Sequence, residues 1–217
     1  MQKTAKNPVR WFAPAIATGT VVAAAFILYR AFSSASAEPG SLPLWSIALA
    51  TVWATGGIAL LRTSNHNQQK PPLNQPQWAL TIMLSLGLAI SSYIGGLVLT
   101  MLPLTSTWIS HALNVASSVP LHITLLIALI TGAAEELFFR VGFASLWSGK
   151  SVWIIPNLLY TLVTLATGNL ALTAVAPILG LVATTAREHS RNVYAPIIVH
   201  ATWTLTMVGI FPLTVTP

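Results

Sequence analysis

The 217-residue sequence contains no cysteine and no aspartate, and only 6% of its residues are charged, whereas soluble domains have about 25%. The absence of cysteine excludes disulfides, thiolate nucleophiles and cysteine-ligated metals. So few charges cannot cover a water-soluble surface, and a 54% hydrophobic content excludes a disordered chain. A polytopic membrane protein remains. Its four acidic residues are glutamates, at positions 38, 135, 136 and 188, so two of them are adjacent.

The ten lysines and arginines give a net charge of +6, but they are scattered along the chain. Nucleic-acid binding requires a basic patch or stripe. We therefore expect no nucleic-acid partner and expect membrane lipid around the protein instead.

Apolar stretches of about 20 residues, the length that crosses roughly 30 Å of hydrocarbon, recur along the chain. We expect an all-α, polytopic membrane protein with about seven transmembrane helices in one domain, residues 1–217. The expected spans are 11–29, 42–61, 78–102, 121–147, 152–167, 170–185 and 193–211. The fifth and sixth are short, and Gly168 and Asn169 between them predict a tight helical hairpin. Residues 106–118 are amphipathic at best and are expected at an interface.

The basic residues predict an orientation. Eight of the ten fall on one side of the expected spans: Lys3, Lys6, Arg10, Arg62, Lys70, Lys150, Arg187 and Arg191. Arg30 falls on the other side, and Arg140 lies inside a span. The positive-inside rule then places the N-terminus in the cytoplasm and the C-terminus outside, in a bacterial-type cytoplasmic membrane.

Residues 1–37 also have features of a cleavable signal peptide, with a basic start, an apolar stretch and Ala35-Ser36-Ala37. The apolar stretch is about 19 residues long, however, and a signal peptide has about 7–15. Arg30 also precedes the small residues. A retained first span is therefore the preferred interpretation.

The candidate site lies in the fourth span, where Glu135, Glu136 and Arg140 are found. Ionisable residues inside a span are costly and usually functional. A structural alternative is that Glu136 and Arg140, four residues apart, only neutralise each other. That alternative leaves Glu135 unexplained, because at about 100° per residue it points to another face and has no cation at a helical spacing. Small residues before the pair, such as Gly132, allow another helix to approach closely.

His200 lies at a similar depth. At 1.5 Å per residue, Glu135 is about 18 Å and His200 about 12 Å from the predicted cytoplasmic ends of their helices. Tyr160 and Thr164 fall at the same depths, one turn apart on one face. These positions predict a water-filled pocket open to the cytoplasm. The remaining histidines are expected to lie away from it: His66, His111, His122 and His189.

The acidic pair and its arginine form the motif Glu-Glu-x-x-x-Arg, and His200 follows an Ala-Pro pair four residues upstream. With this hydropathy, the motifs resemble those of the CAAX-protease and bacteriocin-processing family of intramembrane proteases, which includes the type II CAAX prenyl endopeptidases. The resemblance covers residues 121–207, a protease-like core. It implies that Glu135 activates the hydrolytic water, while Glu136 and Arg140 shape the site.

Two polar positions of the family's pattern are threonine in this chain. Where the family has Phe-x-x-x-His, this chain has Tyr160 and Thr164, and where it has His-x-x-x-Asn, it has His200 and Thr204. A protease-type zinc site needs three protein ligands, and only the two glutamates and His200 remain. We therefore expect no cofactor and disfavour zinc. A metal-free route would use Glu135 as base, with His200 and a threonine hydroxyl at the developing oxyanion.

Three functions follow as hypotheses. The first is a glutamate-dependent intramembrane endopeptidase acting on membrane-associated peptides or proteins. The second is a catalytically silent relative that acts as a binding, immunity or regulatory protein in the membrane. The third, a proton-coupled transporter, is disfavoured because no inverted repeat or broken helix is visible in the sequence. Neither the substrate nor the oligomeric state is specified by the sequence.

Overall fold

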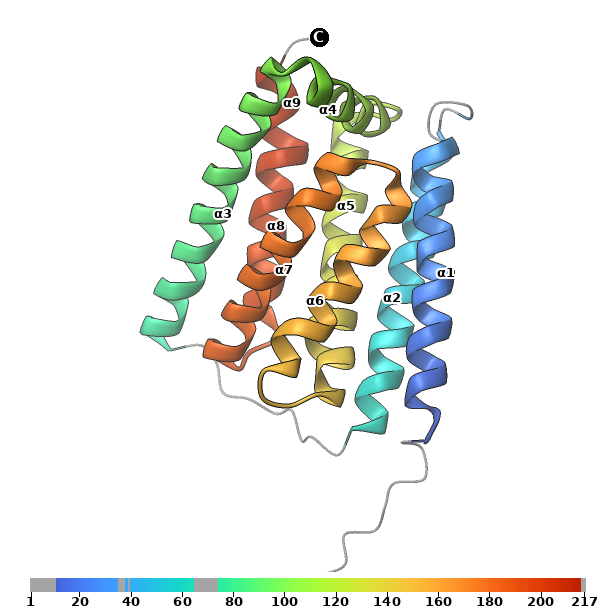
Figure 1. Cartoon of the computed structure of the whole chain (residues 1–217), viewed down its shortest axis with the longest axis vertical. Helices are drawn as coiled ribbons and strands as arrows, with labels where there is room; N and C mark the ends of the chain where they lie inside the picture. Colours follow the sequence, from blue (N-terminus) through green and yellow to red (C-terminus); the bar gives the residue numbers. More distant parts are fainter. Residues whose placement is uncertain (1–10, 35–37, 39, 65–73, 216–217) are drawn as a thin grey trace, which may run out of the picture.

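The computed structural model describes residues 11–34, 38, 40–64 and 74–215 (Figure 1). Within these residues all regular structure is helical, which confirms the all-α prediction. The elements are α1 (Ala13–Ser34), α2 (Leu42–Thr63), α3 (Gln75–Met101), α4 (Pro103–Ala116), α5 (Leu121–Glu136), the π-helical η2 (Leu137–Phe143), η3 (Ala144–Leu146), α6 (Ser151–Thr164), η4 (Leu165–Thr167), α7 (Leu170–Ser190), α8 (Tyr194–Thr204), the π-helical η5 (Leu205–Ile210) and α9 (Phe211–Thr214).

Six helical segments of the described chain are long and apolar enough to cross a membrane. They are α1, α2, α3, Leu121–Leu146, α7 and Tyr194–Thr214, and each coincides with a predicted span. The predicted fifth span is the shorter apolar helix Ser151–Thr167. At 1.5 Å per residue it is about 25 Å long, which is less than the roughly 30 Å of hydrocarbon. The expected seven spans are therefore six long helices and one short one.

The predicted hairpin between α6 and α7 is present. Gly168 turns the chain with φ 66°, a left-handed conformation that glycine adopts without a steric penalty. Asn169 then caps α7, because its side-chain oxygen accepts a hydrogen bond from the Leu172 N–H. An unpaired N–H at the start of the helix is satisfied in this way.

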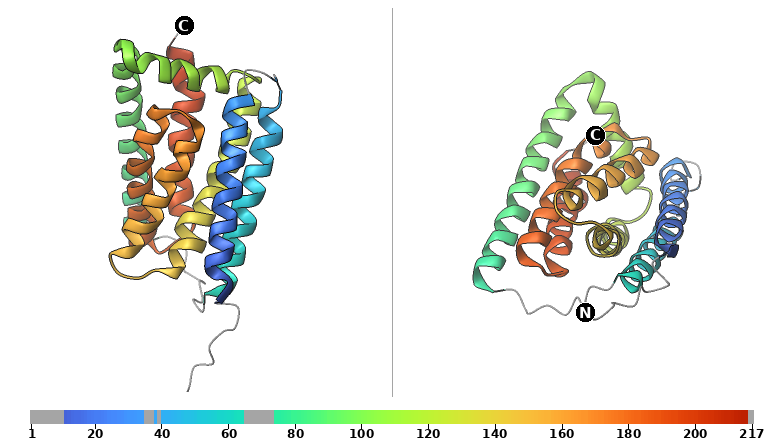
Figure 2. Two further views of the ribbon diagram at one scale, coloured as in Figure 1. Left: turned by 45° about the vertical axis from the view of Figure 1, so that its right-hand side comes forward. Right: turned by 60° about the horizontal axis from the view of Figure 1, so that its bottom comes forward.

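The bundle has two distinct ends (Figures 1 and 2). At one, which we call the α4 end, α4 lies across the bundle near the end of α9. The other, the basic end, holds the last turns of α2 and α7 and the start of α6. Arg62, Lys150, Arg187 and Arg191 belong to the basic end by their places in these elements. Which end faces the cytoplasm stays a prediction.

Several residues used in the sequence predictions lie outside the described part of the chain. These are Lys3, Lys6, Arg10, Lys70, His66 and Ala35-Ser36-Ala37.

Helix α4 is attached to the rest of the bundle by two hydrogen bonds to its backbone. Asn169 Nδ2 donates to the Trp108 carbonyl at 2.7 Å, and Thr124 Oγ1 donates to the Ala116 carbonyl at 2.7 Å. The amphipathic segment predicted at 106–118 is thus part of a helix that crosses one end of the bundle.

An aromatic cluster joins α2 to the segment that follows α5. The ring of Trp53 lies 4.8 Å from that of Phe138 and 4.9 Å from that of Phe139, and Phe143 stacks on Phe138 at 5.9 Å. All four side chains are buried. We call these four residues the aromatic floor, because they lie beneath the cavity described below.

Candidate functional site

Two of the three segments that carry candidate residues change from α-helix to π-helix next to those residues. Helix α5 ends at Glu136 and continues as η2, which contains Arg140, while α8 ends at Thr204 and continues as η5. Single π-helical turns inside helices occur frequently at functional sites. Here they follow the acidic pair in α5 and the segment of α8 that carries His200 and Thr204.

Glu136 is the centre of a buried polar group. Its carboxylate is 0% exposed. Arg140 Nη1 donates to Oε1 at 3.4 Å, and Arg140 Nε lies 3.4 Å from Oε2. His200 Nδ1 lies 2.8 Å from Oε1. Because an ionised carboxylate only accepts hydrogen bonds, the proton of this contact belongs to Nδ1. The ion pair of the structural alternative is present, and His200 joins it.

His200 also packs directly on the backbone of α5. A Cβ atom added at Gly132 would lie 2.9 Å from both Cδ2 and Nε2 of His200. Only glycine leaves room for the imidazole there. The close approach expected from the small residues before Glu135 is therefore the approach of this histidine.

Arg140 is held on its other side by aromatic rings. It is 2% exposed, and its guanidinium carbon lies 4.6 Å from the ring centre of Tyr160 and 5.6 Å from that of Phe139. Contacts of this kind are attractive through the negative face of the ring. They compensate part of the cost of burying the cation.

Glu135 has a different environment from its neighbour. The residue is half-buried, and the described residues include no ion pair to it. It lies within electrostatic range of His200 and beside the side chains of Trp53 and Tyr160. Of the two glutamates, only Glu136 forms an ion pair with Arg140 among the described residues, so the two acids are not bridged by this cation. Glu135 instead lines a cavity.

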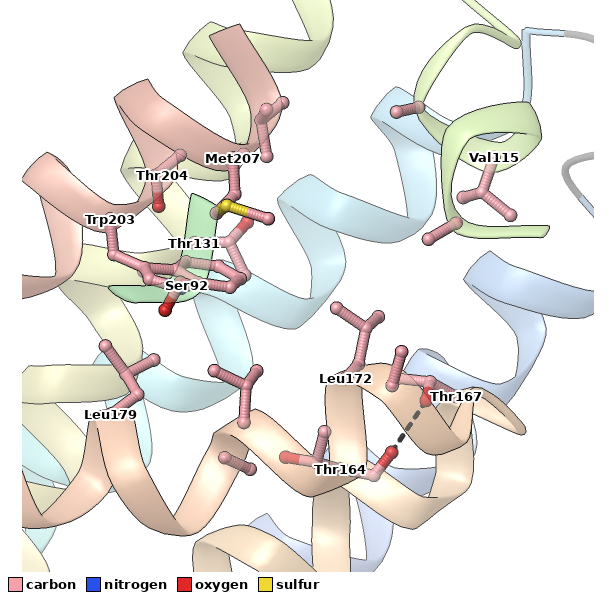
Figure 3. A pocket seen from close by; sticks show the side chains of 18 of the residues that line it. Ser92, Val115, Thr131, Thr164, Thr167, Leu172, Leu179, Trp203, Thr204 and Met207 are labelled. Carbon is pink, nitrogen blue, oxygen red and sulfur yellow. Dashed lines mark hydrogen bonds between the residues drawn. The ribbon is translucent and has the colours of Figure 1, made fainter. Parts of the chain in front are cut away.

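A cavity of about 510 Å³ lies next to Glu135. The candidate residues that line it are Glu135, Tyr160, Thr164, His200 and Thr204. Figure 3 shows Thr164 and Thr167 on one wall, with Thr131, Trp203 and Thr204 across from them. Most of the remaining lining is apolar. The structure thus brings five of the seven candidates to one cavity and places Glu136 and Arg140 behind its wall.

The cavity extends toward the α4 end. It reaches Ile109 and Leu113 of α4 and Leu42 at the start of α2. On the opposite side of the site, the aromatic floor fills the space between α2 and η2. The sequence predicted a pocket open to the end with the basic residues, and the cavity runs away from that end. The position of a residue along its helix indicates the level of its side chain in the bundle. It does not show which packed side chains close the bundle above or below that level.

The Thr164 hydroxyl is used within its own helix. It donates to the Tyr160 carbonyl at 2.9 Å, and Thr167 Oγ1 in turn donates to the Thr164 carbonyl at 2.8 Å (Figure 3). Thr164 can therefore offer the cavity a hydroxyl acceptor but not its proton. Thr204 is buried and lines the cavity on the opposite wall.

The donor set does not fit a zinc ion. Both oxygens of Glu136 face Arg140, and one of them also binds His200 Nδ1. In the described part of the chain, no three His, Asp or Glu side chains are grouped so that they could hold a metal. That the site works without a metal stays a prediction. The contacts of Glu136 with Arg140 and His200 support it.

Two residues near the site were missed in the sequence. Trp53 comes from a span without any motif, and nothing distinguishes it from other tryptophans before the fold is known. Asn157 is an amide inside an apolar span, three residues before Tyr160, and that polarity was a usable signal. The described histidines expected to lie elsewhere, His111, His122 and His189, are absent from the cavity lining.

Residues 116–206 match the family model described as type II CAAX prenyl endopeptidase Rce1-like. This segment of the chain is similar to the CAAX-protease family, and the six long apolar helices are those of an integral membrane protein. The matched segment contains all seven candidate residues and begins close to the protease-like core predicted at 121–207. No curated protein matches the chain, and no solved structure does.

Proposed function

We propose that this CAAX-protease-like protein is a glutamate-dependent intramembrane endopeptidase that cleaves membrane-associated peptides or proteins. One observation carries the proposal. Of the two adjacent glutamates, Glu136 is engaged by Arg140 and His200, whereas Glu135 lines a cavity large enough for a peptide segment. A carboxylate at a cavity wall, without a counter-ion, has the environment of a general base.

The proposed reaction uses the Glu135 carboxylate and one water molecule. The Glu135 carboxylate takes a proton from water, and the hydroxide forms a bond to the scissile carbonyl carbon. The C–N bond of the tetrahedral intermediate then breaks, and the proton passes from Glu135 to the departing amine. The products are a carboxylate and an amine. His200 directs its Nδ1 proton at Glu136, so it can donate a hydrogen bond to the oxyanion only from a second proton on Nε2, as an imidazolium.

The substrate is expected to enter by the apolar part of the cavity. The lining between Glu135 and α4 is mostly apolar, which suits a hydrophobic segment already in the bilayer. No nucleic acid and no cofactor are part of the proposal.

The test uses the protein reconstituted in lipid vesicles with a library of membrane-inserting peptides. New peptide ends, identified by mass spectrometry, are expected with the parent protein and not with Glu135→Gln. Glu188→Gln is the matched control, because Glu188 is exposed on the last turn of α7. Equal products from the parent and Glu135→Gln, or none from the parent, would overturn the proposal.

A catalytically silent relative that binds a membrane partner is the second candidate. It is favoured by the Thr164 hydroxyl, which is committed to the Tyr160 carbonyl and cannot donate to an oxyanion. Restoring the family's residues in Thr164→His and Thr204→Asn distinguishes the two. Cleavage by the double variant but not by the parent would support the silent relative.

A further inference from the structure

Asn157 and Arg140 each carry a buried polar atom that has no hydrogen-bond partner among the described residues. Asn157 of α6 is 8% exposed, and its Oδ1 has no hydrogen-bond partner among the described residues. The same is true of Nε and Nη2 of Arg140. Buried polar atoms nearly always have a partner, so an exception needs an explanation.

Gly180 of α7 brings these two groups to one place. A Cβ atom at this position would overlap Asn157 Oδ1 and would lie 2.7 Å from Arg140 Nη2. The unpaired acceptor and the unpaired donor therefore face the same stretch of backbone. Glycine is required here because either side chain would have to move if a methyl group were present.

The orientation of the Asn157 amide is set by its other contact. Its Nδ2 donates to the Pro177 carbonyl of α7 at 3.2 Å. With the amino group used in this way, the carbonyl oxygen must point to the side where Arg140 lies. The amide thus presents an acceptor to a guanidinium that has donors to spare.

We propose that Asn157 is a positioning residue: its Oδ1 accepts a hydrogen bond from Arg140 Nη2, directly or through one buried water. This hydrogen bond fixes the orientation of the Arg140 guanidinium, which contacts Glu136. Glu136 in turn accepts the hydrogen bond that orients His200. The proposal rests on the proposed function in one respect, that the orientation of His200 matters for cleavage.

Arg140 needs a second directional contact. Its two contacts with Glu136 are both 3.4 Å long, beyond the 2.7–3.2 Å of good N–H···O bonds. The ring of Tyr160 attracts the guanidinium by its face but does not fix its rotation. The hydrogen bond to Asn157 Oδ1 fixes the rotation of the guanidinium.

Asn157 could instead have a purely structural role, in which its Nδ2 bond to the Pro177 carbonyl joins α6 to α7. Two substitutions separate the roles. Asn157→Asp loses the donor to Pro177 but keeps an acceptor for Arg140, whereas the similarly sized Asn157→Leu loses both. The structural role predicts equal damage from the two variants. The positioning role predicts that aspartate rescues what leucine destroys.

The first measurement is independent of catalysis. The full chain in detergent micelles is labelled with ¹⁵N-histidine, and the His200 Nδ1–H signal is assigned by its loss in His200→Gln. We expect the signal to shift or disappear in Asn157→Leu and Gly180→Ala, and to persist in Asn157→Asp. Gly19→Ala is the control, because a Cβ there meets no atom within 4 Å. An unchanged signal in folded Asn157→Leu would overturn the proposal, and so would failure of all three site variants to fold.

The second measurement is the rate of peptide cleavage. Displacing catalytic groups by about 1 Å can cost about 10²-fold in rate, so we expect a loss of that order in kcat for Asn157→Leu, with KM unchanged. Asn157→Asp should stay near the parent rate, and equal losses in both variants would contradict the proposal. If the parent does not cleave, the proposed function fails, and the histidine signal still decides the role of Asn157.

Discussion

His200 Nδ1 lies 2.8 Å from Oε1 of Glu136, and this contact gives the two adjacent glutamates different partners. Glu136 is joined to a histidine and an arginine inside the protein, whereas Glu135 faces the cavity. Two residues that are chemically identical in the sequence thus have separate environments.

Loss of charge at the two glutamates should affect stability unequally. Glu136→Gln leaves buried Arg140 without its counter-ion, and breaking a buried pair costs about 3–5 kcal/mol. Glu135→Gln removes no ion pair and should change the free energy of unfolding little. Unfolding of both variants in detergent micelles, titrated with denaturant, measures the difference. Equal destabilisation would show that Glu136 is not the structural member of the pair.

Gly132→Ala should displace His200. The added methyl group would lie 2.9 Å from Cδ2 and Nε2 of the ring, so the ring must move away from α5. Helix propensity favours alanine over glycine, so the fold should persist while cleavage falls about 10²-fold. Gly87→Ala is the control, because a Cβ there meets nothing within 4 Å. The same rate in both variants would contradict the observed packing of His200.

The attachment of α4 can be separated from the cap of α7 at Asn169. Asn169→Asp keeps the oxygen that accepts from Leu172 N but loses the donor to the Trp108 carbonyl, whereas Asn169→Ala loses both. We expect faster amide hydrogen exchange in α4 for both variants, and at the start of α7 only for alanine. Unchanged exchange in α4 with aspartate would show that the Trp108 contact does not hold the helix.

The orientation in the membrane is open to a direct test because the chain has no cysteine. Ser110→Cys reports on α4 and Ser148→Cys on the basic end, and both serines are exposed. With the N-terminus in the cytoplasm, a membrane-impermeant maleimide should label Ser110→Cys in intact cells and Ser148→Cys only after lysis. The opposite result would reverse the predicted orientation and place the opening of the cavity on the cytoplasmic side.

Much of the fold could be predicted because hydropathy determines which segments cross a membrane. The spans, the Gly168–Asn169 hairpin and the helical class all follow from composition and local turn chemistry. Among the predicted spans, the helix at Ser151–Thr167 is shorter than the six helices that are long enough to cross a membrane.

The site was predictable only as far as its motifs and depths. Spacing along a helix indicates that Glu136 and Arg140 are neighbours, but it does not show that His200 of another helix binds Glu136. The direction of the cavity depends on Trp53 and Phe138, whose packing is a property of the whole bundle. Asn157 could have been identified as a polar residue in a span, whereas its relation to Arg140 requires the position of Gly180.

The most direct test of the account is the single-turnover rate of cleavage of one identified peptide by the parent, Glu135→Gln and Glu188→Gln in the same lipid. General base catalysis contributes about 10²–10⁴-fold, so Glu135→Gln should be slower by that factor while remaining folded, and Glu188→Gln should match the parent. A folded Glu135→Gln protein that cleaves at the parent rate would contradict the assignment of Glu135 as the base.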